Sequence, residues 1–311
     1  MNSWKRFCIV GVGGHARTKL IPAIVANGQE VAGLVSRQPP ENLPAAPLFA
    51  TLDQALAALP KDTVIVIATP PLLHYSQTCA AIDAGFDVIV EKPAFVSSAE
   101  ARDVAARCAA RGTVLIEAFM QRHTRLYQLL LDHCAANPVV ALTLEFIIPA
   151  MPADTFRSER NLASSSLYDI GCYILALLSD LGFELSGLNI TSVEAAGTLA
   201  EAINLDGTLD RTKIAARIGV GAEYRNIVHV GLDDGSKTSF HPVFYGRQGT
   251  KLAAGKTIED DNAFEAMFVV PREQWWNNQA KRLDAVIDVT SRLEVLAEQL
   301  AVFRARSLLS T

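Results

Sequence analysis

The sequence predicts an α/β domain with a parallel sheet, followed by an α+β domain with a mostly antiparallel sheet. Two observations carry this prediction. Short apolar segments alternate with helical segments up to residue 116, which is typical of βαβ units. Beyond residue 125, helical strings flank a series of extended segments. The length of 311 residues also suits two domains, which we place at residues 1–120 and 121–311.

The predicted strands of the first domain are short apolar runs, as expected of strands buried on both faces of a sheet. Val64–Ala68 is the clearest of them, because four of its five residues are β-branched. The other strands are expected at Phe7–Val10, Val31–Val35, Leu48–Phe49, Val88–Val90 and Val114–Ile116. Helices are expected between them at Ala16–Ala26, Leu52–Leu59, a segment ending at Ala84, and Ser98–Arg111.

The second domain begins with a predicted helix at Arg125–Ala135 and a strand at Val139–Ile148. Apolar residues with helical spacing predict two further helices, at Leu167–Leu181 and Leu283–Phe303. Extended segments are expected around Ile190–Leu199, Lys213–Val220 and Ile227–Leu232. This composition favours a mostly antiparallel sheet with helices on one face.

Composition and charge exclude several classes of protein. The 28 Lys and Arg against 33 Asp and Glu give a net charge of −5, which argues against a nucleic-acid partner. The five widely spaced cysteines fit reduced thiols rather than disulfides or a metal site. We expect no signal peptide, because the apolar stretch after Lys5 and Arg6 is short, and no membrane span, because the apolar run at 170–178 is too short to cross a bilayer. We therefore expect a cytoplasmic protein with no bound metal and no membrane partner.

A glycine-rich turn lies between the first strand and the first helix. The segment Gly11-Val12-Gly13-Gly14-His15-Ala16 matches the pattern G-x-G-x-x-A. In such a turn the first glycine permits the tight bend, and the second lets the backbone approach a pyrophosphate. The small Ala16 lets helix and strand pack closely, and the helix N-terminus faces the negative charge. The turn therefore predicts dinucleotide binding, with His15 at its solvent edge or in contact with a phosphate.

The residues after the second strand bear on the choice of dinucleotide. An NAD-specific protein would place an acid about 20 residues beyond the glycine turn, for the ribose 2′-hydroxyl. This chain has Ser36-Arg37 there. A hydroxyl and a guanidinium suit a 2′-phosphate, which favours NADP(H) over NAD(H).

Further motifs follow the later strands, at the carboxyl ends where open α/β sheets bind ligands. Ala68-Thr69-Pro70-Pro71 with His74 follows the fourth strand, and Glu91-Lys92-Pro93 follows the fifth. Glu117-Ala118-Phe119-Met120-Gln121-Arg122 and Asp169-Ile170-Gly171-Cys172-Tyr173 come later. With the glycine turn, these motifs resemble the glucose–fructose oxidoreductase / inositol dehydrogenase (Gfo/Idh/MocA) family. The resemblance is to its glucose–fructose oxidoreductase and dihydrodiol dehydrogenase-like branch, whose members have a tyrosine at the position that corresponds to Tyr173 of this chain.

The resemblance implies a Rossmann domain and a second α+β domain with a large open-faced, predominantly antiparallel sheet. It implies an NAD(P)-dependent oxidoreductase that acts on CH–OH groups of a sugar, nucleotide-linked sugar or cyclic polyol. Lys92 matches the catalytic lysine of the family, and Thr69, Pro70, His74 and Glu91 would lie beside the cofactor. Arg122 and His123 would border the substrate. The family also implies a homodimer or homotetramer, formed through the open sheet face.

The chemistry of Asp169 and Tyr173 supports a catalytic role. They are four residues apart, so they share one face of a predicted helix that is otherwise apolar. The ordinary pKa of tyrosine, about 10, is too high for an efficient base, but a nearby Lys92 ammonium would lower it. We therefore expect Tyr173 to exchange the proton and Asp169 to orient a hydroxyl. Lys92 and His123 are the alternative acids.

Two other functions are compatible with the same motifs. The first is a noncatalytic nucleotide-bound sensor or corepressor, which would have no need for a proton-transfer set. The second is a reductase of a non-sugar carbonyl or imine. In the family a proline usually follows the arginine that corresponds to Arg122, and this chain lacks it. The identity of the substrate therefore cannot be inferred from that of any relative.

Overall fold

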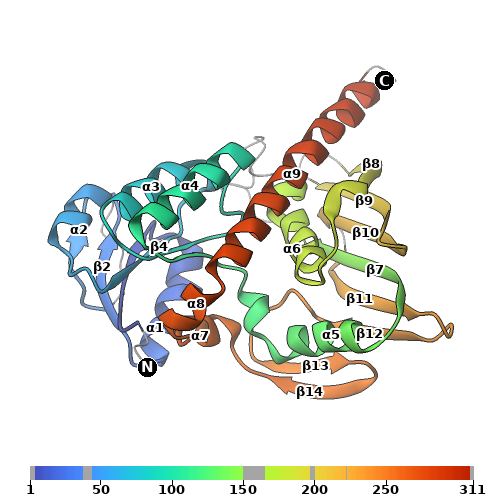
Figure 1. Cartoon of the computed structure of the whole chain (residues 1–311), viewed down its shortest axis with the longest axis horizontal. Coiled ribbons are helices and arrows are strands. Elements are labelled where there is room, and N and C mark those ends of the chain that lie inside the picture. The colour runs from blue at the N-terminus through green and yellow to red at the C-terminus, as the bar shows by residue number, and fades with distance from the viewer. Residues whose placement is uncertain (1–3, 38–43, 150–164, 197–199, 222, 309–311) are drawn as a thin grey trace. The chain divides into compact units, whose positions relative to one another are not determined.

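The computed structural model describes residues 4–37, 44–149, 165–196, 200–221 and 223–308 (Figure 1). The chain divides into two compact units. Unit 1 comprises residues 1–120 and 262–287, and unit 2 comprises residues 121–261 and 288–311. The expected boundary at residue 120 coincides with this division. The segment 262–287 differs from the expectation, because it groups with unit 1.

Hydrogen bonds explain why this distant segment packs on unit 1. The Asn27 side chain donates to the Glu265 carbonyl at 2.8 Å, and the Gln29 side chain donates to the Phe268 carbonyl at 2.8 Å. The rings of Phe7 and Phe268 also meet edge to face at 5.1 Å. The segment forms α7 (Ala263–Phe268), α8 (Arg272–Asn277) and the start of α9 (Gln279–Leu308). Its helices are short or strongly polar, which is why sequence periodicity did not predict α7 and α8.

Unit 1 has a six-stranded parallel sheet with the strand order β3-β2-β1-β4-β5-β6. This is the Rossmann order, in which the connections change direction between β1 and β4, and it confirms the predicted fold class. The strands are β1 (Arg6–Val10), β2 (Glu30–Val35), β3 (Leu48–Phe49), β4 (Thr63–Ile67), β5 (Val88–Val90) and β6 (Leu115–Glu117). The helices are α1 (Ile21–Ala26), α2 (Leu52–Ala58), α3 (His74–Asp83) and α4 (Ser98–Arg111).

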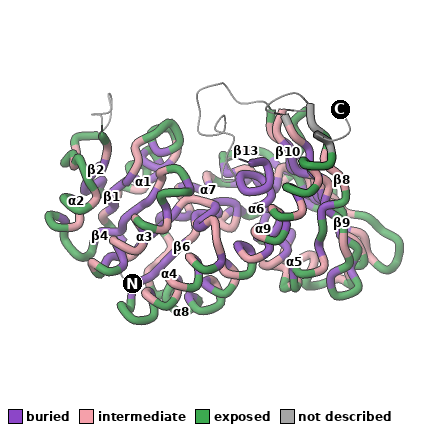
Figure 2. Tube along the Cα trace, turned by 90° about the horizontal axis from the view of Figure 1, so that it is seen from above, coloured by how far each residue is buried: buried purple, intermediate pink, exposed green. Residues whose placement is uncertain are grey.

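The local sequence sets the ends of these helices. The Thr51 side chain accepts from the Gln54 amide at the start of α2, and Ser97 accepts from the Glu100 amide at the start of α4. Gly112 ends α4 in a left-handed conformation, with φ at 64°. The central strands between the helices are buried throughout (Figure 2). The sheet is therefore covered on both faces, as the apolar runs predicted.

Asp87 joins several segments of unit 1 at the amino ends of the strands. Its carboxylate accepts from the Trp4 indole at 3.1 Å, from the Val114 amide at 2.8 Å and from Arg272 Nε at 2.6 Å. The Asp87 side chain is 13% exposed, so solvent cannot replace all of these donors. Asp87 is thus a structural residue that fixes α8 to the sheet.

We predict that Asp87→Ala lowers the free energy of unfolding by about 3 kcal/mol, because it leaves a guanidinium and two N–H donors without their acceptor. Urea denaturation followed by circular dichroism measures the change. Asp62→Ala is the matched control, because Asp62 pairs with Arg6 at the same edge but is 61% exposed. Its expected cost is below about 1 kcal/mol. Equal costs for the two variants would contradict the structural role of Asp87.

Unit 2 has an eight-stranded sheet with the order β14-β13-β12-β11-β7-β10-β9-β8. Only the β7–β10 pair is parallel among the described strand pairs, so the predominantly antiparallel sheet is confirmed. The strands are β7 (Val139–Ile148), β8 (Asn189–Ala196), β9 (Ala200–Leu209), β10 (Thr212–Val220), β11 (Arg225–Leu232), β12 (Lys237–His241), β13 (Gly249–Ala253) and β14 (Lys256–Asp260). The sequence did not predict β9 as a strand of its own. It also did not predict β12, β13 and β14, which are short and rich in polar residues.

One face of this sheet is covered by helices. Along β10, Ile214, Ala216 and Ile218 are buried, while the alternate residues Lys213 and Ala215 are exposed. The covering helices are α5 (Arg125–Ala136), α6 (Cys172–Asp180) and the end of α9 (Figure 1). A buried ion pair between Lys251 and Asp260 (3.0 Å) supports the start of α5, because Asp260 also accepts from the first amides of that helix.

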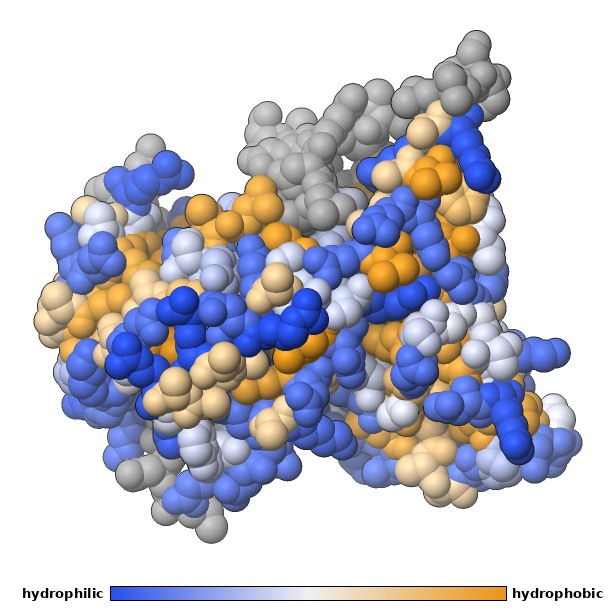
Figure 3. All heavy atoms as spheres, turned by 45° about the horizontal axis from the view of Figure 1, so that its top comes forward, coloured by the Kyte–Doolittle hydropathy of each residue, from blue (hydrophilic) through white to orange (hydrophobic). Residues whose placement is uncertain are grey.

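No described helix is both long and apolar enough to cross a membrane. Hydrophilic residues are spread over the face of the chain in Figure 3. Within the described ranges, no group of three or more His, Cys, Asp or Glu side chains is arranged to hold a metal ion. All five cysteines are free thiols.

Candidate cofactor and catalytic sites

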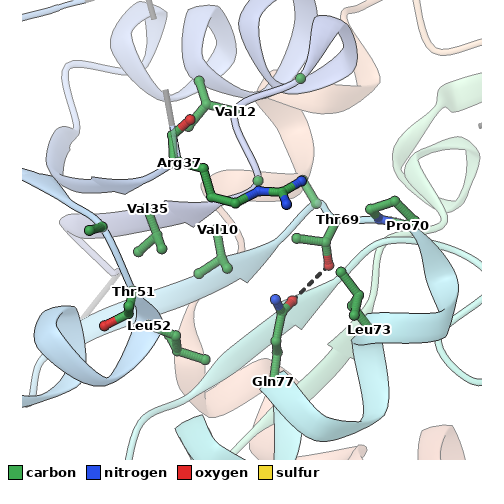
Figure 4. Close-up of a pocket in the computed structure, with 15 residues that line it drawn as sticks. Val10, Val12, Val35, Arg37, Thr51, Leu52, Thr69, Pro70, Leu73 and Gln77 are labelled. Atoms are coloured by element: carbon green, nitrogen blue, oxygen red, sulfur yellow. Dashed lines mark hydrogen bonds between the residues drawn. The ribbon is translucent and has the colours of Figure 1, made fainter. Parts of the chain in front are cut away.

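A cavity of about 920 Å³ lies at the carboxyl ends of the strands of unit 1, where the strand order reverses (Figure 4). Its volume is in the range of ligand pockets. The lining brings together six residues that the sequence predicted: Gly11, Gly13, Ser36, Arg37, Thr69 and Pro70. The lining also includes residues that the sequence did not indicate: Val10, Val12, Val35, Ala50, Thr51, Leu52, Ala68, Leu73 and Gln77.

The glycine turn forms one wall of the cavity, and its first two glycines have different roles. Gly11 has a φ of 91°, and a Cβ atom there would lie 2.8 Å from Thr69 Cγ2 and 2.9 Å from the Ala68 backbone. The fold itself therefore requires glycine at position 11. A Cβ atom on Gly13 would meet no atom within 4 Å. The open space above Gly13 suits the close approach of a diphosphate.

The helix that follows the turn begins with a wide π-type turn at Ala16–Leu20 and continues into α1. Ala16 is buried against the sheet, as expected from its small side chain. The first hydrogen bond of this helix runs from the Arg17 amide to the Gly13 carbonyl at 3.0 Å. The preceding amides are the ones that face an anion at a helix N-terminus. Gly14 and His15 are exposed on the turn and are not part of the cavity lining.

The opposite wall of the cavity carries Arg37 directly after β2. Its side chain is exposed and reaches over the cavity toward Thr69 (Figure 4). Asp and Glu are absent from the described residues that line the cavity. A guanidinium at this position suits a phosphate group, so the described lining fits an NAD(P) dinucleotide. Below Arg37, the Thr69 hydroxyl donates to Gln77 Oε1 at 2.7 Å.

Glu91 connects the glycine turn to Lys92. His15 Nε2 lies 2.9 Å from one carboxylate oxygen of Glu91, and the Lys92 amide donates to the other at 3.3 Å. Burial alone would raise the pKa of Glu91, but the neighbouring His15 and Lys92 outweigh it and the pKa is lowered. Glu91 thus remains ionised and holds the backbone of Lys92. The sequence had led us to expect Glu91 beside the cofactor, but Glu91 does not line the cavity.

The sequence predicted His74 beside the cofactor, but His74 is not part of the cavity lining. It is fully buried, and its Nε2 lies 2.8 Å from the Thr69 carbonyl while Nδ1 lies 3.0 Å from the Pro93 carbonyl. Burial lowers the pKa of His74, against the effect of these carbonyls. Glu117 supports the same loop, because it accepts from the Ala94 amide at 2.8 Å. His74 therefore joins the loops after β4 and β5.

In unit 2, Asp169 and Tyr173 lie on one continuous helical segment. Asp169 belongs to a π-type turn at Leu167–Gly171, and Tyr173 lies in the first turn of α6. π-type turns are frequent at functional sites, because they change the direction of the side chains that follow. Both side chains are buried, with 3% and 8% exposure. Lys92, the third residue of the predicted catalytic set, belongs to unit 1.

Arg122 is held by a structural ion pair. Its Nε and Nη2 donate to the two carboxylate oxygens of Asp180, at 2.8 and 3.0 Å. The Tyr127 hydroxyl donates to the same carboxylate at 2.7 Å. The guanidinium that we expected to border the substrate thus fixes α6 to the start of α5. His123 lies on the same turn, at 120–123, and is half-buried.

Comparisons with known proteins agree with this geometry. The family model for GFO_IDH_MocA, an oxidoreductase family with an NAD-binding Rossmann fold, matches residues 5–119. The chain is 31% identical to D-xylose 1-dehydrogenase (NADP(+)) 2 of Haloferax volcanii over 179 residues, 55% of each chain. It is 32% identical over 182 residues to dTDP-3,4-didehydro-2,6-dideoxy-alpha-D-glucose 3-reductase of Streptomyces violaceoruber, or 56% of this chain and 53% of the relative. The chain spans about half the length of the curated relatives it matches.

A solved structure shares the fold over nearly the whole chain. The 3-ketoreductase from Actinomadura kijaniata, in complex with NADP and TDP-benzene, superposes with a TM-score of 0.75 at 17% identity. The match covers 94% of this chain and 97% of that one. The strand order, the glycine turn and these similarities agree with the resemblance first seen in the motifs. Residues 5–119 are thus similar to the NAD-binding Rossmann domain of the Gfo/Idh/MocA family of oxidoreductases.

Proposed function

We propose that the protein is an NADP(H)-dependent oxidoreductase. It would transfer a hydride between nicotinamide and a carbinol or carbonyl carbon of a sugar, a nucleotide-linked sugar or a cyclic polyol. The observation that carries this proposal is the cavity of unit 1, with a glycine turn on one wall and Arg37 on the other. The names of the two relatives, an NADP(+)-dependent xylose dehydrogenase and a dTDP-ketosugar reductase, support the same class of substrate.

When bound, NADPH supplies the hydride. Residues of this chain would bind the cofactor, orient the substrate and supply the proton. The backbone at Gly11 and Gly13 would hold the diphosphate, and Ser36 and Arg37 would hold the 2′-phosphate. In the direction of reduction, the carbonyl oxygen must gain a proton as the hydride arrives at its carbon. We assign this proton to the Tyr173 hydroxyl.

Lys92 and Asp169 would assist this transfer. The Lys92 ammonium would hold the reacting oxygen and favour the tyrosinate that remains after proton transfer. The Asp169 carboxylate would accept a hydrogen bond from a neighbouring hydroxyl of the substrate and so orient it. Lys92 and His123 are the alternative proton donors, whereas the ion pair of Arg122 with Asp180 supports a structural role for that residue.

We also propose that the protein is a cytoplasmic homodimer or homotetramer. The free thiols support a reducing compartment. The alternation of buried and exposed residues along β10 supports association through the sheet face opposite the helices.

Turnover of NADPH with a panel of aldoses, ketoses, nucleotide-linked ketosugars and cyclic diketones tests the proposed function. We expect at least one member to oxidise NADPH, and we expect Lys92→Ala to abolish most of that activity. Binding of NADPH without turnover of any member would instead favour a nucleotide-bound sensor. Oxidation by a non-sugar carbonyl or imine alone would favour the alternative reductase.

Arg37→Ala is expected to weaken NADPH binding about 10- to 100-fold and to leave NADH binding unchanged, because only the 2′-phosphate requires the guanidinium. Fluorescence titration with the two cofactors measures both affinities. Arg111→Ala is the control for net charge, because Arg111 ends α4 and does not line the cavity. Equal losses for NADPH and NADH would show that Arg37 does not read the 2′-phosphate.

A further inference from the structure

Two aromatic rings from separate segments of unit 2 contact the ring of Tyr173. The ring of Phe146, on β7, lies perpendicular to the Tyr173 ring, with 5.2 Å between the centroids. The ring of Phe244, in the segment after β12, lies 5.9 Å from Tyr173 and 5.0 Å from Phe146. Phe146 and Phe244 are 6% and 3% exposed. Tyr173 is therefore held from two sides by rings that contact each other.

A buried amide fixes the position of Phe244. The Phe244 backbone N–H donates to Asn226 Oδ1 at 2.8 Å, and Asn226 Nδ2 donates to the Tyr224 hydroxyl at 3.0 Å. Asn226 lies on β11 directly opposite Phe146 in the sheet register, and it is 5% exposed. The same short region of the sheet thus anchors both phenylalanines. An apolar residue at 226 could fill this space, but it could not accept from the Phe244 amide.

We propose that Phe146 and Phe244 are positioning residues that fix the ring of Tyr173 for proton transfer, and that Asn226 fixes Phe244. The inference rests on the proposed role of Tyr173. The Tyr173 hydroxyl oxygen lies on the axis of the Cβ–Cγ bond, so the reacting oxygen moves when rotation about the Cα–Cβ bond swings the whole ring. Edge-to-face contact on two sides limits this rotation, and a displacement of about 1 Å at a reacting group can cost about 100-fold in rate.

The proposal predicts a specific effect of Phe244→Leu. This variant keeps an apolar side chain but removes the ring contacts with Tyr173 and Phe146. We expect the rate of hydride transfer to fall about 10-fold, part of the loss that full displacement would cause. The affinity for NADPH should not change, because Phe244 belongs to unit 2 and the cofactor cavity to unit 1.

Phe240→Leu is the matched control. Phe240 lies four residues earlier, on β12, is 1% exposed, and packs against the His133 ring at 5.4 Å rather than against Tyr173. The same change of side chain there should cost similar stability but leave the rate within about 2-fold. Asn226 provides a second test: Asn226→Asp retains an acceptor for the Phe244 amide and should keep most activity, whereas Asn226→Ala should behave like Phe244→Leu.

A double-mutant cycle with Tyr173→Phe decides whether Phe244 acts through Tyr173. Single-turnover hydride transfer is measured for the wild type, each single variant and the double variant. We expect Phe244→Leu to add less than about 2-fold to the loss caused by Tyr173→Phe. A further 10-fold loss in the double variant, or an equal loss in Phe240→Leu, would overturn the positioning role. Full activity of Tyr173→Phe itself would instead overturn the proposed role of Tyr173, on which the positioning role rests.

Discussion

Tyr173→Phe is expected to lower the rate of hydride transfer about 100- to 10,000-fold, the usual contribution of a positioned acid or base. The variant keeps the ring and its contacts with Phe146 and Phe244, and loses only the hydroxyl that we assign to proton exchange. NADPH affinity should not change, because the cofactor cavity belongs to unit 1. Stopped-flow decay of NADPH fluorescence gives the rate, and a titration without substrate gives the affinity.

The control for this result is Tyr127→Phe, which removes a hydroxyl from another buried tyrosine of the same unit. Tyr127 donates to Asp180 at 2.7 Å, so the variant tests the loss of a structural hydrogen bond. We expect its cost in the free energy of unfolding to be about 1 kcal/mol and its effect on hydride transfer to be small. An undiminished rate in Tyr173→Phe would move the proton donor to Lys92 or His123.

Gly13→Val is the second variant with a large expected effect. It is expected to weaken the binding of NADPH and NADH alike, on the order of 100-fold, because the side chain occupies the space above the turn that a diphosphate would fill. The thermal stability of the free protein should not change, since a Cβ at this position meets no atom within 4 Å. Fluorescence titration and thermal denaturation measure the two quantities.

Gly11→Ala gives the contrasting result. Its φ of 91° and the Cβ distances of 2.8 and 2.9 Å to Thr69 and Ala68 mean that the substitution strains the folded chain itself. We therefore expect Gly11→Ala to lose stability as well as affinity, whereas Gly13→Val loses affinity alone. If Gly13→Val binds NADPH as tightly as the wild type, the diphosphate does not pass over the glycine turn.

The parallel sheet could be predicted because its strands are buried on both faces. A strand such as β4 is then a continuous run of β-branched residues, a pattern that few other structural elements require. Strands β12, β13 and β14 of the second sheet have no such run, since most of their residues are polar or partly exposed. The return of residues 262–287 to unit 1 depends on contacts such as that between Asn27 and the Glu265 carbonyl, which no local pattern reveals.

Some residues of the candidate site could likewise be predicted from the sequence, and others could not. Gly11, Gly13 and Arg37 were predicted because the backbone of a βα turn fixes where they lie. Gln77 was not predicted, because its place in the lining depends on how α3 packs beside the loop after β4. His74 was assigned to the cofactor because polar residues at strand ends often bind ligands. Both of its ring nitrogens lie within hydrogen-bond distance of main-chain carbonyls, which only the folded structure shows.

The central claim is that this chain moves a hydride between NADPH and a carbonyl carbon of a sugar-like substrate. Transfer of deuterium from NADPH labelled at C4 tests this claim most directly, with the products of the carbonyl panel analysed by mass spectrometry. The account predicts one deuterium on the new carbinol carbon of at least one sugar, nucleotide-linked sugar or cyclic polyol, and its loss in Tyr173→Phe. Tight NADPH binding with no deuterium in any product would contradict it.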